Sequence, residues 1–295
     1  MIRAILAATI LIGLIGLTGA SALAQQASWK SGASGGDAGG FASWRGTPLG
    51  LATGWAPWDN WGNMLSYMSG SNPRALRSRS QNVSIGLGLF SQNGGNLDDC
   101  AAGRYAHNHR SIGSRLAANG LGDAELRLGW EANNGSYPWT AVGRSATQWK
   151  ACFASAARAL KAGGQDLRIA WHMAKKGKVD VRSLWPDEAA ALITNVGVSH
   201  FDDAQALLGL ETSNGSPWGL RAWLRFAQEK GKRLELAEWG GGRRGDNASY
   251  IQNMHEFFRE AGDRLAHEGY LNGREHQLYP NTRLPSSAAR YRELF

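Results

Sequence analysis

Residues 124–172 read AELRLGWEANNGSYPWTAVGRSATQWKACFASAARALKAGGQDLRIAWH, and this stretch decides the fold class. It begins with a short apolar run typical of a buried strand (124–130) and ends with another (167–172). Between them, residues 145–162 carry the apolar spacing of a helix, with Ser145 as N-cap and a glycine pair after the last turn. Strand, helix and strand in this order predict a βαβ unit with parallel strands.

The same alternation extends along the chain. Strand-like runs lie at 49–55, 83–90, 124–130, 167–172, 196–201 and 234–239, and helical patterns lie at 101–119, 145–162, 218–230 and 248–262. Two more strands are expected near 61–68 and 268–272, which would complete a (β/α)8 TIM barrel. The alternative is a doubly wound open sheet, which usually has a glycine-rich phosphate loop after its first strand. The residues at that point are WAPWDNW (55–61), so the barrel is favoured.

The N-terminus has the three parts of a secretory signal peptide, which we assign to residues 1–24. Arg3 supplies the positive charge, residues 4–17 are an apolar run and Ala22-Leu23-Ala24 fits the small-x-small cleavage pattern. The apolar run is short for a permanent membrane span, and no second span follows it. We therefore expect a secreted or periplasmic protein whose mature chain begins at Gln25.

The mature chain is expected to form one domain. Residues 25–40 are rich in glycine, serine and alanine and are assigned to a flexible leader, because they offer little apolar surface to offset the entropy of ordering. Residues 41–295 have a normal length for a single barrel, and no proline-rich linker or short repeat divides them. We expect a monomer.

Charge and cysteine content restrict the partners. The net charge is +8 and the isoelectric point about 9.7, which favours acidic glycans or anionic cell-surface material as partners. The lysines and arginines are scattered and no nucleic-acid motif accompanies them, so nucleic acid is not expected.

Cys100 and Cys152 have no metal or redox spacing. They are either two buried thiols or a disulfide, and export favours the disulfide.

Two carboxylates follow predicted strands. Glu131 comes directly after the run at 124–130, and Glu238 lies at the end of the run at 234–239. In a barrel the working residues lie at the C-terminal ends of strands, so these two should face one rim. Glu235 lies in the same strand as Glu238 but with opposite side-chain parity, so it is expected to point the other way.

A pair of carboxylates among aromatic rings suits the cleavage of glycosidic bonds. One carboxyl protonates the leaving oxygen, while the other attacks the anomeric carbon or activates water. The chain contains 13 tryptophans, many of them beside predicted loops. Trp130, Tyr137 and Trp139 are assigned as walls around Glu131. Trp171 and Trp239 are assigned, with Tyr137, as walls of the cleaving subsite, and outer subsites are assigned to Trp55, Trp58, Trp139 and Trp218. His172 and His200 are assigned as hydrogen-bonding groups.

Each of these residues also has an ordinary structural interpretation. A single glutamate at a strand end is commonly a solvated rim residue, and single tryptophans are commonly core or lid residues. His172 and His200 lack the HExxH spacing of a metalloenzyme, so we expect no metal and no cofactor.

Two motifs carry a resemblance to a known family. The stretch RLGWEANNGSYPW (127–139) resembles the acid/base segment of glycoside hydrolase family 26, which contains the β-mannanases, and LAEWG (236–240) is similar to its nucleophile strand. VGVSHFD (196–202) resembles the sixth strand of that family. The resemblance covers residues 44–294. It implies a retaining (β/α)8 hydrolase in which Glu131 and Glu238 follow strands four and seven, with Arg127 and Asn133 as supporting residues.

The chain departs from the family at two positions. Trp130 stands where the family usually has a histidine. Near the end of the sixth strand, where the family usually has a tyrosine that supports the nucleophile, this chain has Phe201. These departures leave the identity of the substrate open.

The resulting hypothesis is an exported, retaining, endo-acting glycoside hydrolase that cleaves an extracellular or cell-surface polysaccharide or oligosaccharide by double displacement. The alternatives are a non-catalytic glycan-binding barrel, an inverting hydrolase, and a transglycosylase in exopolysaccharide processing.

Overall fold

A computed structural model describes residues 29–35, 37–202, 212–213, 216–217 and 219–295. The strands are β1 (Lys30–Ser34), β2 (Leu51–Trp55), β3 (Val83–Leu87), β4 (Glu125–Leu128), β5 (Arg168–Ala174), β6 (Ile193–Phe201), β7 (Thr212–Ser213), β8 (Ser216–Pro217), β9 (Arg233–Gly240) and β10 (Leu265–Leu271). The α-helices are α1 (Ala38–Arg45), α2 (Trp61–Ser69), α3 (Ser71–Arg79), α4 (Leu97–Ala101), α5 (Ala106–Ala118), α6 (Ala146–Gly163), α7 (Leu220–Glu229), α8 (Ala248–Ala261) and α9 (Pro285–Leu294).

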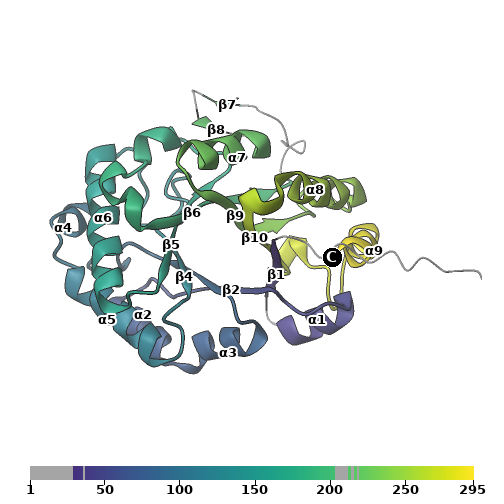
Figure 1. Cartoon of the computed structure of the whole chain (residues 1–295), viewed down its shortest axis with the longest axis horizontal. Helices are drawn as coiled ribbons and strands as arrows, with labels where there is room; N and C mark the ends of the chain where they lie inside the picture. The colour runs from purple at the N-terminus through teal and green to yellow at the C-terminus, as the bar shows by residue number, and fades with distance from the viewer. Residues whose placement is uncertain (1–28, 36, 203–211, 214–215, 218) are drawn as a thin grey trace, which may run out of the picture.

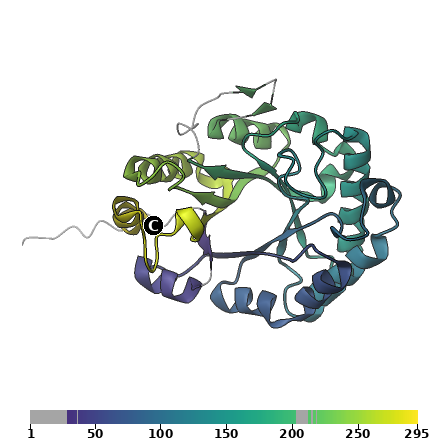
Figure 2. The ribbon, with the colours of Figure 1, turned by 180° about the vertical axis from the view of Figure 1, so that it is seen from behind.

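The strands form a closed parallel barrel in the order β1-β10-β9-β6-β5-β4-β3-β2. Helices surround this ring, as seen down the barrel in Figure 1 and from the opposite side in Figure 2. Short 3-10 helices at Val181–Leu184 and Asp187–Leu192 connect β5 to β6 in place of an α-helix. The predicted (β/α)8 class is therefore confirmed.

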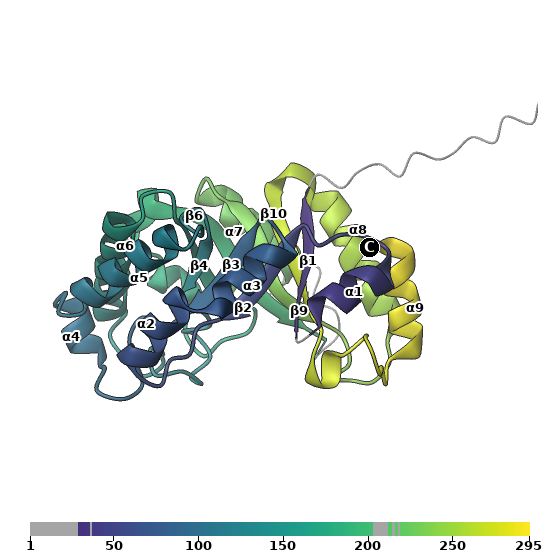
Figure 3. The same cartoon turned by 90° about the horizontal axis from the view of Figure 1, so that it is seen from below.

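The first strand corrects the predicted leader at 25–40. Residues 30–34 form β1, which pairs with β10 on one side and with β2 on the other, and so closes the barrel. In the side view this N-terminal strand lies beside β10, near the C-terminal elements (Figure 3). The sequence KSGAS has no large apolar residue, so it does not look like a strand. Its small side chains instead allow neighbouring strands to approach closely. A Cβ on Gly32 would lie 2.1 Å from the carbonyl oxygen of Leu51.

Two other predicted elements differ from the structure. Residues 61–69 form α2 instead of a strand, because Asn60 caps its N-terminus and Met64 and Met68 are buried one turn apart. The helical pattern at 101–119 is two helices, α4 and α5, separated by a turn in which Gly103 adopts a φ of 77°. The strand expected near 268–272 is observed as β10.

The barrel has an apolar outer layer and a polar interior. Trp171 on β5 packs against Trp223 and Phe226 of α7, and fully buried side chains fill the same layer around the ring. Inside the barrel, contacts join strands that are not neighbours, such as His172 of β5 with Glu235 of β9. Barrel interiors are usually filled with branched apolar side chains, so a polar interior calls for a specific explanation. Among the described residues, no helix combines the length and the apolar character needed to cross a membrane.

Cys100 of α4 and Cys152 of α6 form a disulfide across 52 positions of sequence. Both side chains are buried, so the bridge fastens two helices of the outer layer. Replacing both cysteines by alanine should lower the free energy of unfolding by about 2–4 kcal/mol, because the unfolded chain regains the entropy of a long loop. Urea denaturation of the variant and of the oxidised wild type measures this. Equal unfolding midpoints would contradict a stabilising role.

Candidate active site

A bulge in β9 brings two glutamates to the inside of the barrel. The pairing register of β9 shifts between Leu236 and Trp239 against β10, and again against β6. As a result both Glu235 and Glu238 contact side chains across the interior, Glu235 with His172 and Glu238 with Trp55. The expectation from strict alternation that Glu235 points away from the Glu238 side is wrong, because an extra residue in the strand resets the alternation.

Glu238 is held by two donors on the same oxygen. Its Oε1 accepts hydrogen bonds from Trp55 Nε1 at 2.8 Å and from Arg127 Nη2 at 3.0 Å. The Arg127 guanidinium lies over the Trp55 ring, 5.5 Å from its centroid, and also donates to Ser84 Oγ and the Gly54 carbonyl. Glu238 is 6% exposed and Arg127 fully buried, so this ion pair is formed away from bulk water. The paired charges keep the carboxylate in one orientation.

Glu131 follows β4 in a strained backbone conformation. Its φ is 52°, which is rare for a residue with a side chain, and its N–H donates to the His172 carbonyl at 2.9 Å. Its Oε2 accepts a hydrogen bond from Asn134 Nδ2 at 2.6 Å. Burial, and next the negative charge of Glu238, raise the pKa of Glu131 above its ordinary value. The two carboxyl groups therefore act on each other within one site.

An aromatic cluster stands beside Glu131. Tyr137 and Trp139 stack with their ring centroids 5.1 Å apart, and Trp58 meets Trp130, Tyr137 and Trp139 edge-on. Trp58 and Tyr137 are half-buried, whereas Trp130 and Trp139 are buried behind them. Burial, and next the charge of Glu131, raise the pKa of Tyr137 to about 12, so its hydroxyl keeps its hydrogen near neutral pH. Of these four rings, only Trp58 and Tyr137 are open to a ligand.

Several predicted substrate-binding residues lie elsewhere. Trp171 and Trp239 point outward into the helix layer, where Trp239 donates to Glu268 and contacts the ring of Tyr250. His200 also points outward, and its Nδ1 is 3.0 Å from the Tyr250 hydroxyl. These three assignments are wrong, because alternation along β5, β6 and β9 places the side chains on the outer face.

Three further assignments change or remain outside the described residues. Asn133 is buried and bonds both to the carbonyl and to the N–H of Ala174, so it fastens the Glu131 loop to β5 instead of meeting a ligand. His172 is also fully buried, and its two ring nitrogens contact Glu235 and Ser199 inside the barrel. Trp218 lies outside the described residues.

The sequence did not single out some residues that form the site. Asn134 binds Glu131, and Ser199 on β6 interacts with the Glu131 carboxyl group and with His172. Ser199 and Phe201 share the inward side of β6, so their spacing of two was the available signal. Phe201 stacks on His276, with the Arg243 guanidinium 4.6 Å from its ring centroid. No local pattern pointed to His276.

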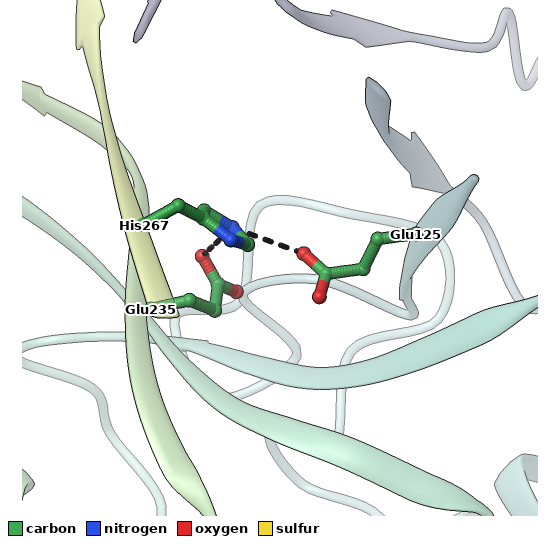
Figure 4. Close-up of side chains that lie close together, drawn as sticks. All are labelled: Glu125, Glu235 and His267. Carbon is green, nitrogen blue, oxygen red and sulfur yellow. Dashed lines mark ion pairs between the residues drawn. The ribbon is translucent and has the colours of Figure 1, made fainter. Parts of the chain in front are cut away.

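The floor of the barrel contains a buried ionic triad, drawn in Figure 4. His267 Nε2 lies 3.0 Å from Glu125 Oε1 and 3.5 Å from Glu235 Oε2, and all three side chains are buried. Asn195 donates to the other oxygen of Glu125. Burial disfavours a charged imidazole, but the two carboxylates outweigh it and raise the pKa of His267 to about 9. Conversely, burial disfavours the Glu125 carboxylate, but the charge of His267 lowers its pKa.

The three residues of the triad are also of types that bind metal ions. Two carboxylate oxygens and one imidazole nitrogen lie within 4.8 Å of one another. In this structure the three side chains contact one another as ion pairs, with His267 Nε2 facing an oxygen of each carboxylate. We therefore interpret the group as an ion triad, in which the cation neutralises the two buried anions.

The triad predicts how stability depends on pH. Because the pKa of folded His267 is raised above that of the unfolded chain, its stabilising contribution is complete below about pH 6.5 and is lost as the pH rises through about 9. The free energy of unfolding should fall by about 3 kcal/mol across this window. His267→Gln should remove this decline, and His107→Gln, which changes an exposed histidine, should keep it. Urea denaturation at several pH values measures both. Parallel curves for wild type and His267→Gln would refute the assignment.

The fold and the site together define a (β/α)8 barrel with a carboxylate pair at the ends of its fourth and seventh strands, β4 and β9. No protein-family model and no curated protein matches the sequence. Solved structures share the fold. GH26C from a Muricauda species has 13% sequence identity and a TM-score of 0.64, with 91% of this chain and 85% of that chain covered.

Two mannanase structures are similar to the same degree. The GH26 β-mannanase of Bacteroides ovatus has 12% identity and a TM-score of 0.62, with 91% of this chain and 88% of that chain covered. The modular endo-β-1,4-mannanase of Cellulomonas fimi has 17% identity and a TM-score of 0.60, with 90% and 69% covered. The chain therefore has the fold of the family 26 glycoside hydrolases, as the sequence motifs suggested.

Proposed function

We propose that the protein is a retaining glycoside hydrolase with Glu131 as acid/base and Glu238 as nucleophile. The observation that carries this proposal is the difference between the two carboxyl groups. Glu238 is fixed by Arg127 and Trp55, whereas Glu131 has a raised pKa and accepts a hydrogen bond from the neutral amide of Asn134. A carboxyl group fixed by a cation suits the nucleophile, and a carboxyl group with a raised pKa suits the acid. The fold shared with family 26 structures supports the same assignment.

The proposed reaction is a double displacement. Glu238 attacks the anomeric carbon as the glycosidic bond breaks, and the proton of Glu131 passes to the leaving oxygen. Glu131, now ionised, takes a proton from water as that water attacks the glycosyl-enzyme and releases Glu238. Tyr137 and Trp58 supply the aromatic surface on which sugar rings can lie. A retaining mechanism requires the two carboxyl groups to be about 5–5.5 Å apart.

We propose a polysaccharide as substrate, with preference for an acidic one. The net charge of +8 supports the preference, as does Arg243, which contributes positive charge at Glu131. A single chain supplies both carboxyl groups, which is consistent with a monomeric enzyme. A mannan is a second candidate substrate, because two of the similar structures are mannanases.

The proposal is tested by a substrate screen. Mannan, mixed-linkage glucan, xylan and neutral and acidic bacterial exopolysaccharides are incubated with the protein, and products are read by mass. We expect oligosaccharides, most of all from an acidic polymer, whose anomeric configuration is retained when followed by NMR. Glu131→Gln and Glu238→Gln should each lower cleavage at least a thousandfold, because each removes a reacting group. Glu229→Gln, on the exposed face of α7, should be unchanged.

The leaving group separates the two roles. An aryl glycoside with a good leaving group needs no proton for the first step, so Glu131→Gln should still release the aryl alcohol and accumulate a glycosyl-enzyme, whereas Glu238→Gln should not. Full activity of Glu238→Gln would exclude it as nucleophile. Inverted products would replace double displacement by a single displacement. Binding of oligosaccharides without any cleavage would favour the glycan-binding alternative.

We propose that the protein is exported to the periplasm or secreted. The three-part pattern of residues 1–24 supports this, together with the two cysteines, whose disulfide suits an oxidising compartment. Expression of the full chain in a bacterial host should give a mature protein whose N-terminal sequence begins at Gln25. An uncut chain that stays in the cytoplasm would contradict export.

A further inference from the structure

Three strands of the barrel begin with a basic residue: Lys30 of β1, Arg168 of β5 and Arg233 of β9. Their register partners on the neighbouring strands are His267, Glu125 and Asn195, respectively. Glu125 contacts both His267 and Asn195 across the barrel, so these three partners point inward. Because residues paired in register share a face of the sheet, the three basic residues also point inward. They lie together at the N-terminal opening of the barrel.

The three basic residues and Asn82 form the lowest interior layer of the barrel. Each interior layer of a (β/α)8 barrel takes four side chains from alternate strands, and β1, β3, β5 and β9 are alternate strands here. Asn82 directly precedes β3, and its Oδ1 accepts a hydrogen bond from Lys30 Nζ at 2.7 Å, which spans the intervening strand β2. Such layers usually contain branched apolar side chains, whereas this layer contains three cations.

The layer is open to solvent, and its cations act on one another. Lys30 and Arg233 are exposed, and Arg168 is half-buried. Burial, and next the charges of Arg168 and Arg233, lower the pKa of Lys30 below its ordinary value. An ion in solution can therefore reach a group of like charges here without passing the carboxyl pair of the candidate active site.

The three cations donate hydrogen bonds to uncharged oxygens, which are Asn82 Oδ1 for Lys30, the Asp123 carbonyl for Arg168 and the Leu265 carbonyl for Arg233. Within the described part of the chain, none of the three forms an ion pair. The Asp123 carboxylate lies at the same end of the barrel, but it is paired with Arg77. The charges of the layer are therefore not taken up by a carboxylate in direct contact.

The lower half of the barrel carries a surplus of positive charge. Above the layer lies the triad of Figure 4, in which the His267 imidazolium stands between the carboxylates of Glu125 and Glu235. Together with the three cations of the layer, four positive charges face two negative charges, so two positive charges remain. Holding like charges together costs free energy, which an anion between them would offset. A doubly charged anion matches the surplus.

We propose that this opening binds a doubly charged oxyanion, a phosphate group, between Lys30, Arg168 and Arg233. The planar guanidinium groups can each donate two hydrogen bonds to phosphate oxygens, and the lysine ammonium adds a compact charge. The site lies at the opposite end of the barrel from Glu131 and Glu238, so the inference does not depend on the proposed reaction. The bound group is either free phosphate or a phosphate ester on a larger molecule.

Binding of inorganic phosphate to the protein tests the site. Thermal unfolding is followed in phosphate and in chloride of equal ionic strength, slightly above neutral pH, where phosphate is mostly doubly charged. At about ten times the Kd, phosphate should raise the unfolding midpoint by about 3–6 °C, because it binds the folded protein only. Isothermal titration calorimetry gives the Kd. The same titration with glucose 6-phosphate distinguishes the sources, since equal affinity identifies a group on a larger molecule and weaker affinity identifies the free ion.

Single substitutions locate the site. Lys30→Gln and Arg233→Gln should each weaken phosphate binding at least about tenfold, because each removes a charge-assisted hydrogen bond at an exposed position. Lys30→Arg keeps the charge and should bind phosphate within about threefold of the wild type. Arg225→Gln is the matched control, because it removes the same charge from the exposed face of α7, and it should leave binding unchanged.

Two results would overturn the inference. One is an equal unfolding midpoint of the wild type in phosphate and in chloride. The other is an equal loss of affinity in Arg225→Gln and in the two site variants, which would show that phosphate responds only to the net charge. Neither readout uses the cleavage of a polysaccharide, so a failure of the proposed function is recognised separately from a failure of this site.

Discussion

Charges that are buried in a barrel must be paired, and this constraint shapes the interior of the protein. Arg127 neutralises Glu238, and His267 neutralises Glu125 and Glu235. Removing one member of a buried pair leaves an uncompensated charge, which is far more costly than the pair itself. The pairs also require space. A Cβ on Gly197 would lie 1.8 Å from Glu235 Oε1, so glycine at that position makes room for the Glu235–His172 contact.

The same constraint makes the two candidate catalytic carboxyl groups different. Glu238 has the buried guanidinium of Arg127 against it, so its carboxyl group is paired with a cation. Burial and the negative charge of Glu238 raise the pKa of Glu131, and its Oε2 accepts a hydrogen bond from the Asn134 amide. The Ser199 hydrogen bond and the charge of Arg243 act in the opposite direction without outweighing them. Two identical side chains at the ends of β4 and β9 thus stand in different electrostatic surroundings, and the raised pKa of Glu131 suits the acid of the proposed reaction.

Much of this arrangement could be predicted from the sequence, and the failures have physical causes. Six of the barrel strands were readable because their outer faces carry apolar residues, and Glu131 and Glu238 followed from their positions after two of them. Strand β1 was missed because its residues are small and its stability comes from pairing with β10 and β2. The inward position of Glu235 was missed because a bulge has no local signature in LELAEW. Trp171, Trp239 and His200 were misassigned because tryptophan and histidine can pack between the strands and the surrounding helices as readily as they can line a sugar site.

The two departures from the family 26 pattern are explained by their surroundings. At position 201 a phenylalanine ring stacks on His276 beneath Arg243, so it offers no hydroxyl to Glu238. The second donor to Glu238 comes instead from Trp55 Nε1, on the opposite side of the barrel. Trp130 is buried among Trp58, Tyr137 and Trp139 and braces the loop that holds Glu131, while Asn134 makes the polar contact to the carboxyl group. Both carboxyl groups therefore keep hydrogen-bond donors although the donors come from other positions, and the substitutions alter the shape of the site while leaving its proposed chemistry intact.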